Sequence, residues 1–155
     1  MFIRLLTSMI LAVTMLGATQ WCVGQATDNR IEKAKELFEN YVRLEHEFDP
    51  AVADLYSDEA VIRNKRKYPT GETRELAIPA KEYKPMVRMS MPIAKLRGDT
   101  CKYTDISYSA EGDGVRIKAD RYSELKKYNS LISILVKPDS AGVWLIYEEL
   151  GESQP

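Results

Sequence analysis

Two polar residues interrupt an apolar row in the segment from residue 115 to residue 125. Every second side chain of a β-strand points to the same face. Here that set is Val115, Ile117, Ala119, Arg121, Ser123 and Leu125. A few polar groups among apolar side chains are typical of a ligand pocket. We therefore expect Arg121 to project into a cavity and to bind an anionic or carbonyl oxygen. The alternative is a place at the rim, or an ion pair with a buried acid.

Nucleophilic and metal-dependent chemistry have little support in the sequence. Beyond residue 26 the chain holds one histidine, His46, and one cysteine, Cys101. One residue of each kind excludes a zinc cluster and a Ser-His or Cys-His triad built from several such residues. We expect His46 in solvent and Cys101 as a small buried apolar residue. No cofactor and no metal site are predicted.

Acid–base catalysis by carboxylates and tyrosines is the remaining enzymatic option. Asp120, Glu124 and Glu149 are candidates. Each would need to be buried with a shifted pKa to act as a general acid or base. The sequence alone leaves the catalytic residues unassigned.

The first 26 residues have the pattern of a secretory signal peptide. Arg4 is their only charge, an apolar stretch follows it, and small residues occupy positions −3 and −1 of a cut after Ala26. We predict removal of residues 1–26, leaving one periplasmic or secreted domain over residues 27–155. Retention of the segment as an anchor is the alternative. No membrane contact is predicted after cleavage.

The charge balance also limits the partners. The formal net charge is −1 for the 155 residues and −2 without the segment that holds Arg4. A slightly acidic chain is not a general nucleic-acid binder, so no nucleic-acid partner is predicted. The basic run from Arg63 to Lys67 is expected to be a solvated ribbon, with a protein-docking surface as the alternative.

Apolar periodicity and turn residues predict an α+β order of elements. The expected helices cover residues 30–48, 50–56 and 80–96, and a hairpin covers residues 60–78. Four antiparallel strands are expected over residues 102–110, 115–127, 131–137 and 143–150.

The third expected helix has an apolar stripe at helical spacing. Its members are Met86, Met89, Ile93 and Leu96. Such a stripe is expected in the core, although methionines also suit an adaptable pocket.

Three stretches carry a resemblance to a known superfamily. "DLYSDEAVI", "EGDGVRIKADRYSELKKY" and "WLIYEELGES" resemble the nuclear transport factor 2-like superfamily, which includes SnoaL-like and ketosteroid isomerase-like proteins. The resemblance implies a cystatin-like cone, in which a curved antiparallel sheet wraps a long N-terminal helix around an apolar pocket. The isomerase catalytic set is not carried over, because the expected first strand over residues 60–67 holds no carboxylate.

The expected pocket residues are aromatic or inward-facing side chains, together with the polar side chains that interrupt an apolar row. They are Tyr41, Tyr83, Met89, Tyr108, Arg121, Ser123 and Tyr147. The main hypothesis is an exported, non-catalytic protein that binds a small, partly apolar molecule or a peptide. An isomerase- or hydratase-like enzyme is the first alternative and predicts a buried carboxylate beside a tyrosine hydroxyl. A protein-interaction module is the second alternative and predicts a filled cone.

The last two expected strands are apolar on both faces. Only the face on the concave side of the sheet is buried inside the domain. An exposed apolar patch as large as the other face is unusual for a monomer. We therefore predict a homodimer through the outer face of the sheet, a partner that the resemblance also implies.

Overall fold

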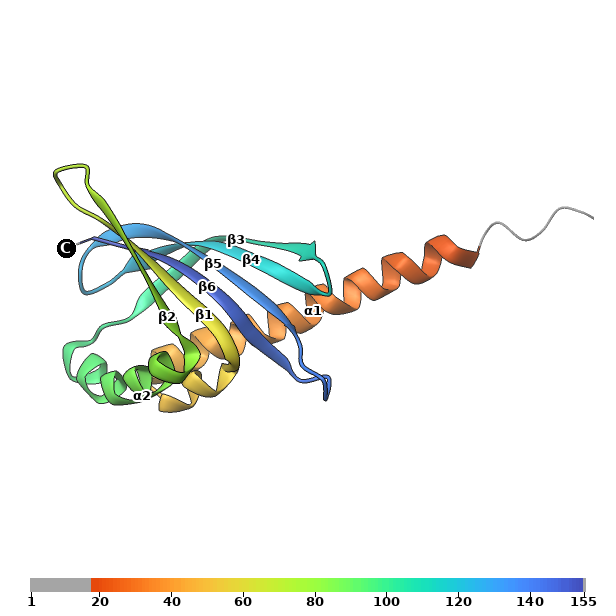
Figure 1. Cartoon of the computed structure of the whole chain (residues 1–155), viewed down its shortest axis with the longest axis horizontal. Coiled ribbons are helices and arrows are strands. Elements are labelled where there is room, and N and C mark those ends of the chain that lie inside the picture. The colour runs from red at the N-terminus through yellow and green to blue at the C-terminus, as the bar shows by residue number, and fades with distance from the viewer. Residues whose placement is uncertain (1–17, 155) are drawn as a thin grey trace, which may run out of the picture.

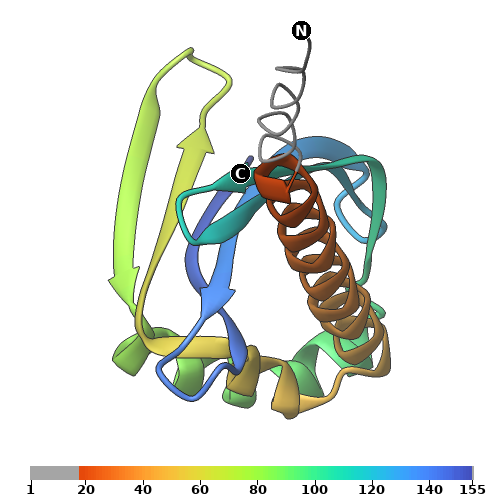
Figure 2. The same cartoon turned by 90° about the vertical axis from the view of Figure 1, so that its right-hand side faces the viewer.

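The computed structural model describes residues 18–154 and the side chains of residues 29–154. A curved sheet of six strands wraps around one long helix, and a second helix closes one end (Figures 1 and 2). The helices are α1 (Ala18–Glu47), the short 3-10 helix η1 (Pro50–Leu55) and α2 (Ala80–Arg97). The strands are β1 (Tyr56–Lys67), β2 (Thr73–Pro79), β3 (Cys101–Glu111), β4 (Gly114–Ser123), β5 (Tyr128–Pro138) and β6 (Trp144–Ser153). The α+β cone expected from the sequence is confirmed.

Helix α1 begins earlier than the sequence predicted. It starts at Ala18, so Asn29, the residue just before the helix expected over residues 30–48, lies inside the helix. An asparagine inside a helix costs only a few tenths of a kcal/mol, so it does not force the helix to start there. Residues 1–17 of the predicted signal peptide lie outside the described residues. The domain boundary after Ala26 stays a prediction.

The junction between η1 and β1 has no linker. Asp49 caps η1 by accepting a hydrogen bond from the N–H of Ala51 at 2.8 Å, and Pro50 takes the first helical position. Tyr56 follows directly as the first residue of β1. The sequence analysis placed Tyr56 in the helix. Its position at the start of the strand turns its side chain into the cone, where it is buried.

The sheet is mixed, which corrects the expectation of a wholly antiparallel sheet. The strand order is β2-β1-β6-β5-β4-β3, and β1 pairs with β6 in parallel while the other neighbours are antiparallel. The crossover through α2 causes this, because it returns β3 in the direction of β2. Three further reversals then bring β6 into the direction of β1.

The core lies between α1 and the concave face of the sheet. Helix α1 contributes buried residues at three- and four-residue steps, and the sheet contributes alternate positions of its central strands. Val115, Ile117 and Ala119 are buried there, which confirms the predicted facing of β4. Arg121 is next in that row and therefore points into the same cone.

Helix α2 packs through the face opposite to the predicted one. Ala80 and Val87 are its buried residues, and Tyr83 and Met91 pack beside them. The stripe expected in the core is exposed instead. On the packed side, Lys84 forms an ion pair with Asp58 at 2.5 Å and Arg88 forms one with Asp54. Both acids flank the η1–β1 junction. These pairs therefore border the face of α2 that packs against this junction.

Candidate functional site

A cluster of aromatic rings fills the centre of the cone. Tyr41 of α1 lies parallel to Phe38, with 5.9 Å between ring centroids, and both meet Tyr103 of β3 edge-on. Burial is the largest cause of the raised pKa of Tyr41, and the nearby carboxylates raise it further. These phenols stay neutral at any physiological pH and can only donate or accept hydrogen bonds.

Glu149 lies deepest in the cone. It sits on β6 opposite Ile62 and Ile134, and only 6% of its surface is exposed. The hydroxyl of Tyr56 donates a short hydrogen bond to Glu149 Oε2. Burial raises the pKa of Glu149, while this hydrogen bond and the positive charge of Arg121 act against the rise.

Tyr83 of α2 completes the closed side of the cluster. Its ring meets that of Tyr56 edge-on at 5.2 Å between centroids. Burial raises the pKa of both phenols, and the charge of Glu149 adds to the rise. The two smaller pockets of the described residues do not include Glu149 or Tyr56 in their walls. Glu149 is instead among the residues that line the larger pocket on the outer face of the sheet.

Glu45 stands nearer the open end. It lies in the last turn of α1, and the Tyr103 hydroxyl donates a hydrogen bond of 2.7 Å to its Oε2. Burial is the largest cause of its raised pKa, and hydrogen bonding from Tyr103 is the strongest opposing effect. Glu45 lines the pocket at this end of the cone, which Glu149 does not reach.

Arg121 lies close to both acids and lowers the pKa of each. Its Nε donates to Ser130 Oγ at 3.2 Å and its Nη2 donates to the backbone oxygen of Glu152 at 2.8 Å. The guanidinium rests over Gly151, where a Cβ would lie 3.9 Å from Nη2. A guanidinium has five N–H donors, more than these two contacts use.

The pocket at this end of the cone has a volume of about 270 Å³. Its walls come from the end of α1, from α2 and from strands of the sheet. Glu45, Met91, Cys101, Arg121, Ser123, Tyr128 and Ser130 are among the lining residues. We call it the mouth pocket. Two acids, two basic side chains, hydroxyls and a few apolar side chains meet there, which suits a small polar molecule below drug size. Asp99 is the second acid and Lys126 is the second basic residue.

The structure separates the seven predicted pocket residues. Arg121 and Ser123 line the mouth pocket, and Tyr41 and Tyr83 lie in the closed aromatic cluster. The other three lie outside both the mouth pocket and the aromatic cluster. They are Met89, Tyr108 and Tyr147.

Each of the three has a physical reason to lie elsewhere. Met89 is 76% exposed, because α2 packs through its other face. Tyr108 lies against α1 near Glu39 and Glu32, where burial raises its pKa. Tyr147 stands beside the irregularity in the β5–β6 pairing, and its ring lies 4.3 Å from Lys137 Nζ.

The sequence analysis missed Glu45, Tyr56 and Tyr103 as site residues. Glu45 follows Tyr41 by one helical turn, and this i, i+4 spacing was the available signal. Of the three acids named as conditional candidates, Glu149 is buried with a raised pKa. Glu124 is half-buried and pairs with Lys102, and a hydrogen bond from Lys102 is the largest cause of its lowered pKa.

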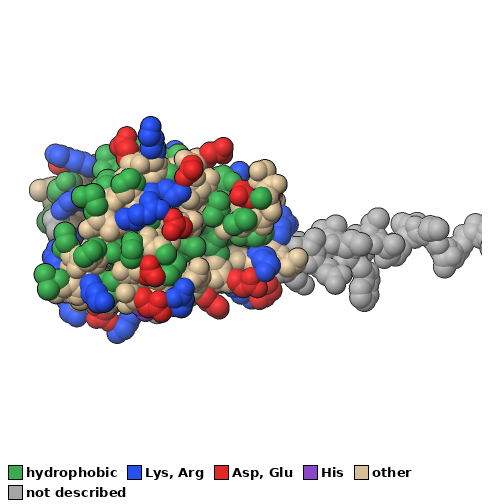
Figure 3. Space-filling model, turned by 90° about the horizontal axis from the view of Figure 1, so that it is seen from below, with side chains coloured by type: hydrophobic (Ala, Val, Ile, Leu, Met, Phe, Trp, Pro, Cys, Tyr) green, Lys and Arg blue, Asp and Glu red, His purple; other side chains and the backbone are tan. Residues whose placement is uncertain are grey.

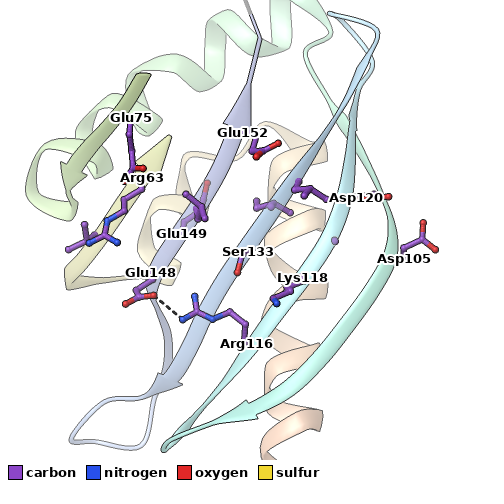
Figure 4. Close-up of a pocket in the computed structure, with 15 residues that line it drawn as sticks. Arg63, Glu75, Asp105, Arg116, Lys118, Asp120, Ser133, Glu148, Glu149 and Glu152 are labelled. Atoms are coloured by element: carbon purple, nitrogen blue, oxygen red, sulfur yellow. Dashed lines mark hydrogen bonds and ion pairs between the residues drawn. The ribbon is translucent and has the colours of Figure 1, made fainter. Parts of the chain in front are cut away.

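The largest cavity lies on the outer face of the sheet, away from α1 (Figure 4). It measures about 780 Å³, and we call it the outer groove. Arg63, Arg116, Lys118, Asp120, Glu148 and Glu152 alternate there with Val61, Leu131 and Leu150. Arg116 bridges Glu111 at 2.6 Å and Glu148 at 2.9 Å. The sequence analysis predicted only the pocket inside the cone.

The described residues hold neither a metal-binding cluster nor a helix that could span a membrane. No group of three His, Cys, Asp or Glu side chains among those residues is placed to hold a metal ion. Within the same part of the chain, no helix has the length and apolar character needed to cross a bilayer.

Solved structures with the same fold are found across bacteria. A nuclear transport factor 2-like protein with a cystatin-like fold from Novosphingobium aromaticivorans aligns with a TM-score of 0.61 and 13% identity, over 90% of this chain and 91% of that chain. A candidate ketosteroid isomerase from Shewanella frigidimarina aligns with a TM-score of 0.56 and 14% identity, over 77% and 94%. A candidate dehydratase from Streptomyces avermitilis aligns with a TM-score of 0.53 and 13% identity, over 81% and 96%.

No protein-family model matches the chain, and no curated protein sequence matches it. The structural matches define the fold: the chain has the cystatin-like fold of the nuclear transport factor 2-like proteins. Identities of 13 to 14% do not transfer an activity, because this fold carries sites of several kinds.

Proposed function

We propose that the protein is an exported, non-catalytic binding protein for a small ligand that carries a carboxylate or carbonyl group. The main support for this proposal is the position of Arg121. This residue lines the mouth pocket, is held by Ser130 and Glu152, and keeps further donors. Met91 and Ala94 supply apolar wall on the α2 side. The mouth pocket favours a ligand over the interaction-module hypothesis, which predicted a cone filled without a cavity. The aromatic cluster fills only the centre of the cone.

Calorimetry with benzoate, a small carboxylate with an apolar ring, tests the role of Arg121. Arg121→Met is expected to weaken benzoate binding about tenfold or more, since a hydrogen bond to a charged group contributes ~1.5–3 kcal/mol. Arg116→Met, on the opposite face of β4, is the matched control and is expected to bind as the unchanged chain does. Equal binding by all three proteins would disprove the role of Arg121.

Native mass spectrometry of the protein purified from its own host tests the rest of the proposal. A mass that begins at Thr27 supports export, and an additional retained mass identifies the ligand class. A chain that still carries residues 1–26 after export would contradict the predicted cleavage.

A second candidate function is acid–base catalysis, and one contact favours it. Glu45 is a pocket-lining carboxyl with a raised pKa, and a tyrosine hydroxyl already donates to it. Such a group can remove a proton α to a carbonyl when Arg121 holds the carbonyl oxygen. Glu149 has the same partner type but no opening toward the mouth pocket.

Proton exchange distinguishes the two functions. The α-protons of cyclohexanone in D₂O exchange at the buffer rate if the protein only binds. An enzyme accelerates the exchange, and Glu45→Gln then returns it to the buffer rate, whereas the exposed neighbour Glu47→Gln does not. Acceleration that survives Glu45→Gln would rule out Glu45 as the base.

We also propose that a second copy of the chain covers the outer groove. Basic and acidic side chains alternate with exposed Leu131 and Leu150 across this face. A two-fold axis through such a patch can bring Arg63 or Lys118 of one copy against Glu148 or Asp120 of the other. Light scattering at micromolar concentration should report a dimer that Leu131→Asp dissociates. A monomer for the unchanged chain would contradict this proposal.

A further inference from the structure

Helix α2 presents an apolar face that the fold leaves uncovered. Met86, Met89, Ile93 and Leu96 are 54, 76, 59 and 88% exposed. They lie at steps of three and four residues, so they form one continuous row along the helix. We call them the α2 outer row. Scattered apolar residues on a surface are ordinary, but a contiguous row of four large ones marks an interaction surface.

The same helix concentrates positive charge. Its 18 residues hold five Lys or Arg and one Glu, a net of +4 in a chain whose formal net charge is −1. Lys84 and Arg88 pair with acids of the η1–β1 region. Lys81, Lys95 and Arg97 are exposed on the same helix, and the exposed acid Glu82 lies one turn before Met86. Hydrophobic side chains lie among Lys and Arg at the end of the molecule where α2 is found (Figure 3).

The shape of this face indicates what kind of partner it takes. The outer groove, the mouth pocket and the pocket beside Trp144 are lined by no member of the outer row. Protein hot spots concentrate in well-packed pockets that shield them from water. A lipid surface needs no recess, because the acyl chains adapt to a protruding row of apolar side chains.

We propose that the outer row of α2 docks on an anionic lipid bilayer, with its apolar side chains in the headgroup region and Lys81, Lys95 and Arg97 against lipid phosphates. A helix with an apolar stripe bordered by Lys and Arg lies in the plane of such an interface. The proposal departs from the sequence-based expectation of no membrane contact. That expectation placed this stripe in the core, whereas the structure exposes it.

Vesicle flotation of the full chain is the first test. The protein is expected to float with vesicles of phosphatidylcholine and phosphatidylglycerol and to bind more weakly to phosphatidylcholine alone. Leu96→Glu should lower the partition coefficient about tenfold or more, since it removes buried apolar area and adds repulsion. Val143→Glu changes an exposed apolar residue of the β5–β6 turn and is expected to leave binding unchanged. Equal loss in both variants would overturn the proposal.

A local probe separates α2 from any contribution of residues 1–26. Leu96→Trp is expected to shift its emission to the blue on anionic vesicles and to become protected from aqueous iodide. Val143→Trp should show neither change. A tryptophan at position 96 that stays open to iodide while the protein floats would overturn the proposal, as would equal protection on neutral vesicles.

Two controls distinguish the lipid proposal from ligand binding in the mouth pocket and from self-association. Arg121→Met is expected to retain vesicle binding, because the mouth pocket faces into the cone. Self-association of the full chain that Leu96→Glu abolishes, with no blue shift on vesicles, would assign the outer row to a second copy and overturn the lipid proposal.

Discussion

Two carboxylates with the same kind of partner stand at different depths of one cone. Glu149 accepts from Tyr56 at the closed side, and Glu45 accepts from Tyr103 at the open side. Burial raises the pKa of both acids. Only Glu45 reaches the mouth pocket, where Arg121 and Ser123 also lie.

This difference shows that a buried carboxyl with a raised pKa is not by itself a functional group. Perturbed pKa values arise wherever a charge is removed from water, in structural networks as well as in active sites. Access decides between the two roles. We therefore assign Glu149 and Tyr56 to the closed core of the cone, and Glu45 with Arg121 to the proposed ligand site.

The sharpest test of this comparison is the pair of variants Tyr56→Phe and Tyr103→Phe. Tyr56→Phe leaves a buried carboxyl without its donor, so the free energy of unfolding should fall by about 1–3 kcal/mol at neutral pH. Tyr103→Phe should cost less, because water in the mouth pocket can replace the lost donor to Glu45. Urea denaturation measures both values. Equal losses would contradict the contrast between a closed and an open site.

The pH dependence of stability separates Glu149 from its neighbour on β6. A carboxyl whose pKa is raised on folding binds more protons in the folded state, so its contribution is fully present at low pH. That contribution is lost as pH rises from the ordinary glutamate pKa through the folded pKa. Glu149→Gln should flatten this decline and raise stability at neutral pH relative to the unchanged chain.

Glu148→Gln is the matched control for this pH effect. Glu148 lies on the outer face beside Arg116, so its replacement should leave the decline in place. Thermal unfolding at a series of pH values from the ordinary glutamate pKa upward measures each variant. A decline that persists in Glu149→Gln would assign the raised pKa elsewhere.

A smaller effect is expected for ligand affinity at the open site. Ionised Glu45 repels a carboxylate held on Arg121, so benzoate affinity should fall as pH rises through the raised pKa of Glu45. Glu45→Gln should remove this fall and leave the affinity at low pH unchanged. Calorimetry at several pH values measures it. A fall that persists in the variant would place the titrating group outside the mouth pocket.

The smallest effect concerns Cys101 in the wall of the mouth pocket. Burial raises the pKa of its thiol to about 12, so little thiolate forms at neutral pH. In a Cys22→Ser background, iodoacetamide should leave Cys101 unmodified in the folded protein and modify it in urea. Rapid alkylation of the folded chain would show that the pocket wall opens far more than the structure indicates.

Periodicity and punctuation in the sequence determined the elements and the fold. The Asp49-Pro50 pair predicted the start of η1, and alternation in β4 predicted that Arg121 faces inward. These are local rules, because a strand has period 2 and a proline fits only certain helical positions. The resemblance supplied the cone, which no local pattern contains.

Only the tertiary structure decided which face of α2 is buried and which acid is open. Helix α2 has two apolar faces, and the one that packs, with Ala80 and Val87, is bordered by the pairs Lys84–Asp58 and Arg88–Asp54. Those acids lie some 25 to 35 residues earlier in the chain, so periodicity within the helix could not reveal them. Depth in the cone likewise depends on pairing β6 with β1 across the whole domain. The sequence alone therefore determined that Arg121 faces the interior, whereas long-range packing decided which face of α2 is buried and which interior groups a ligand can reach.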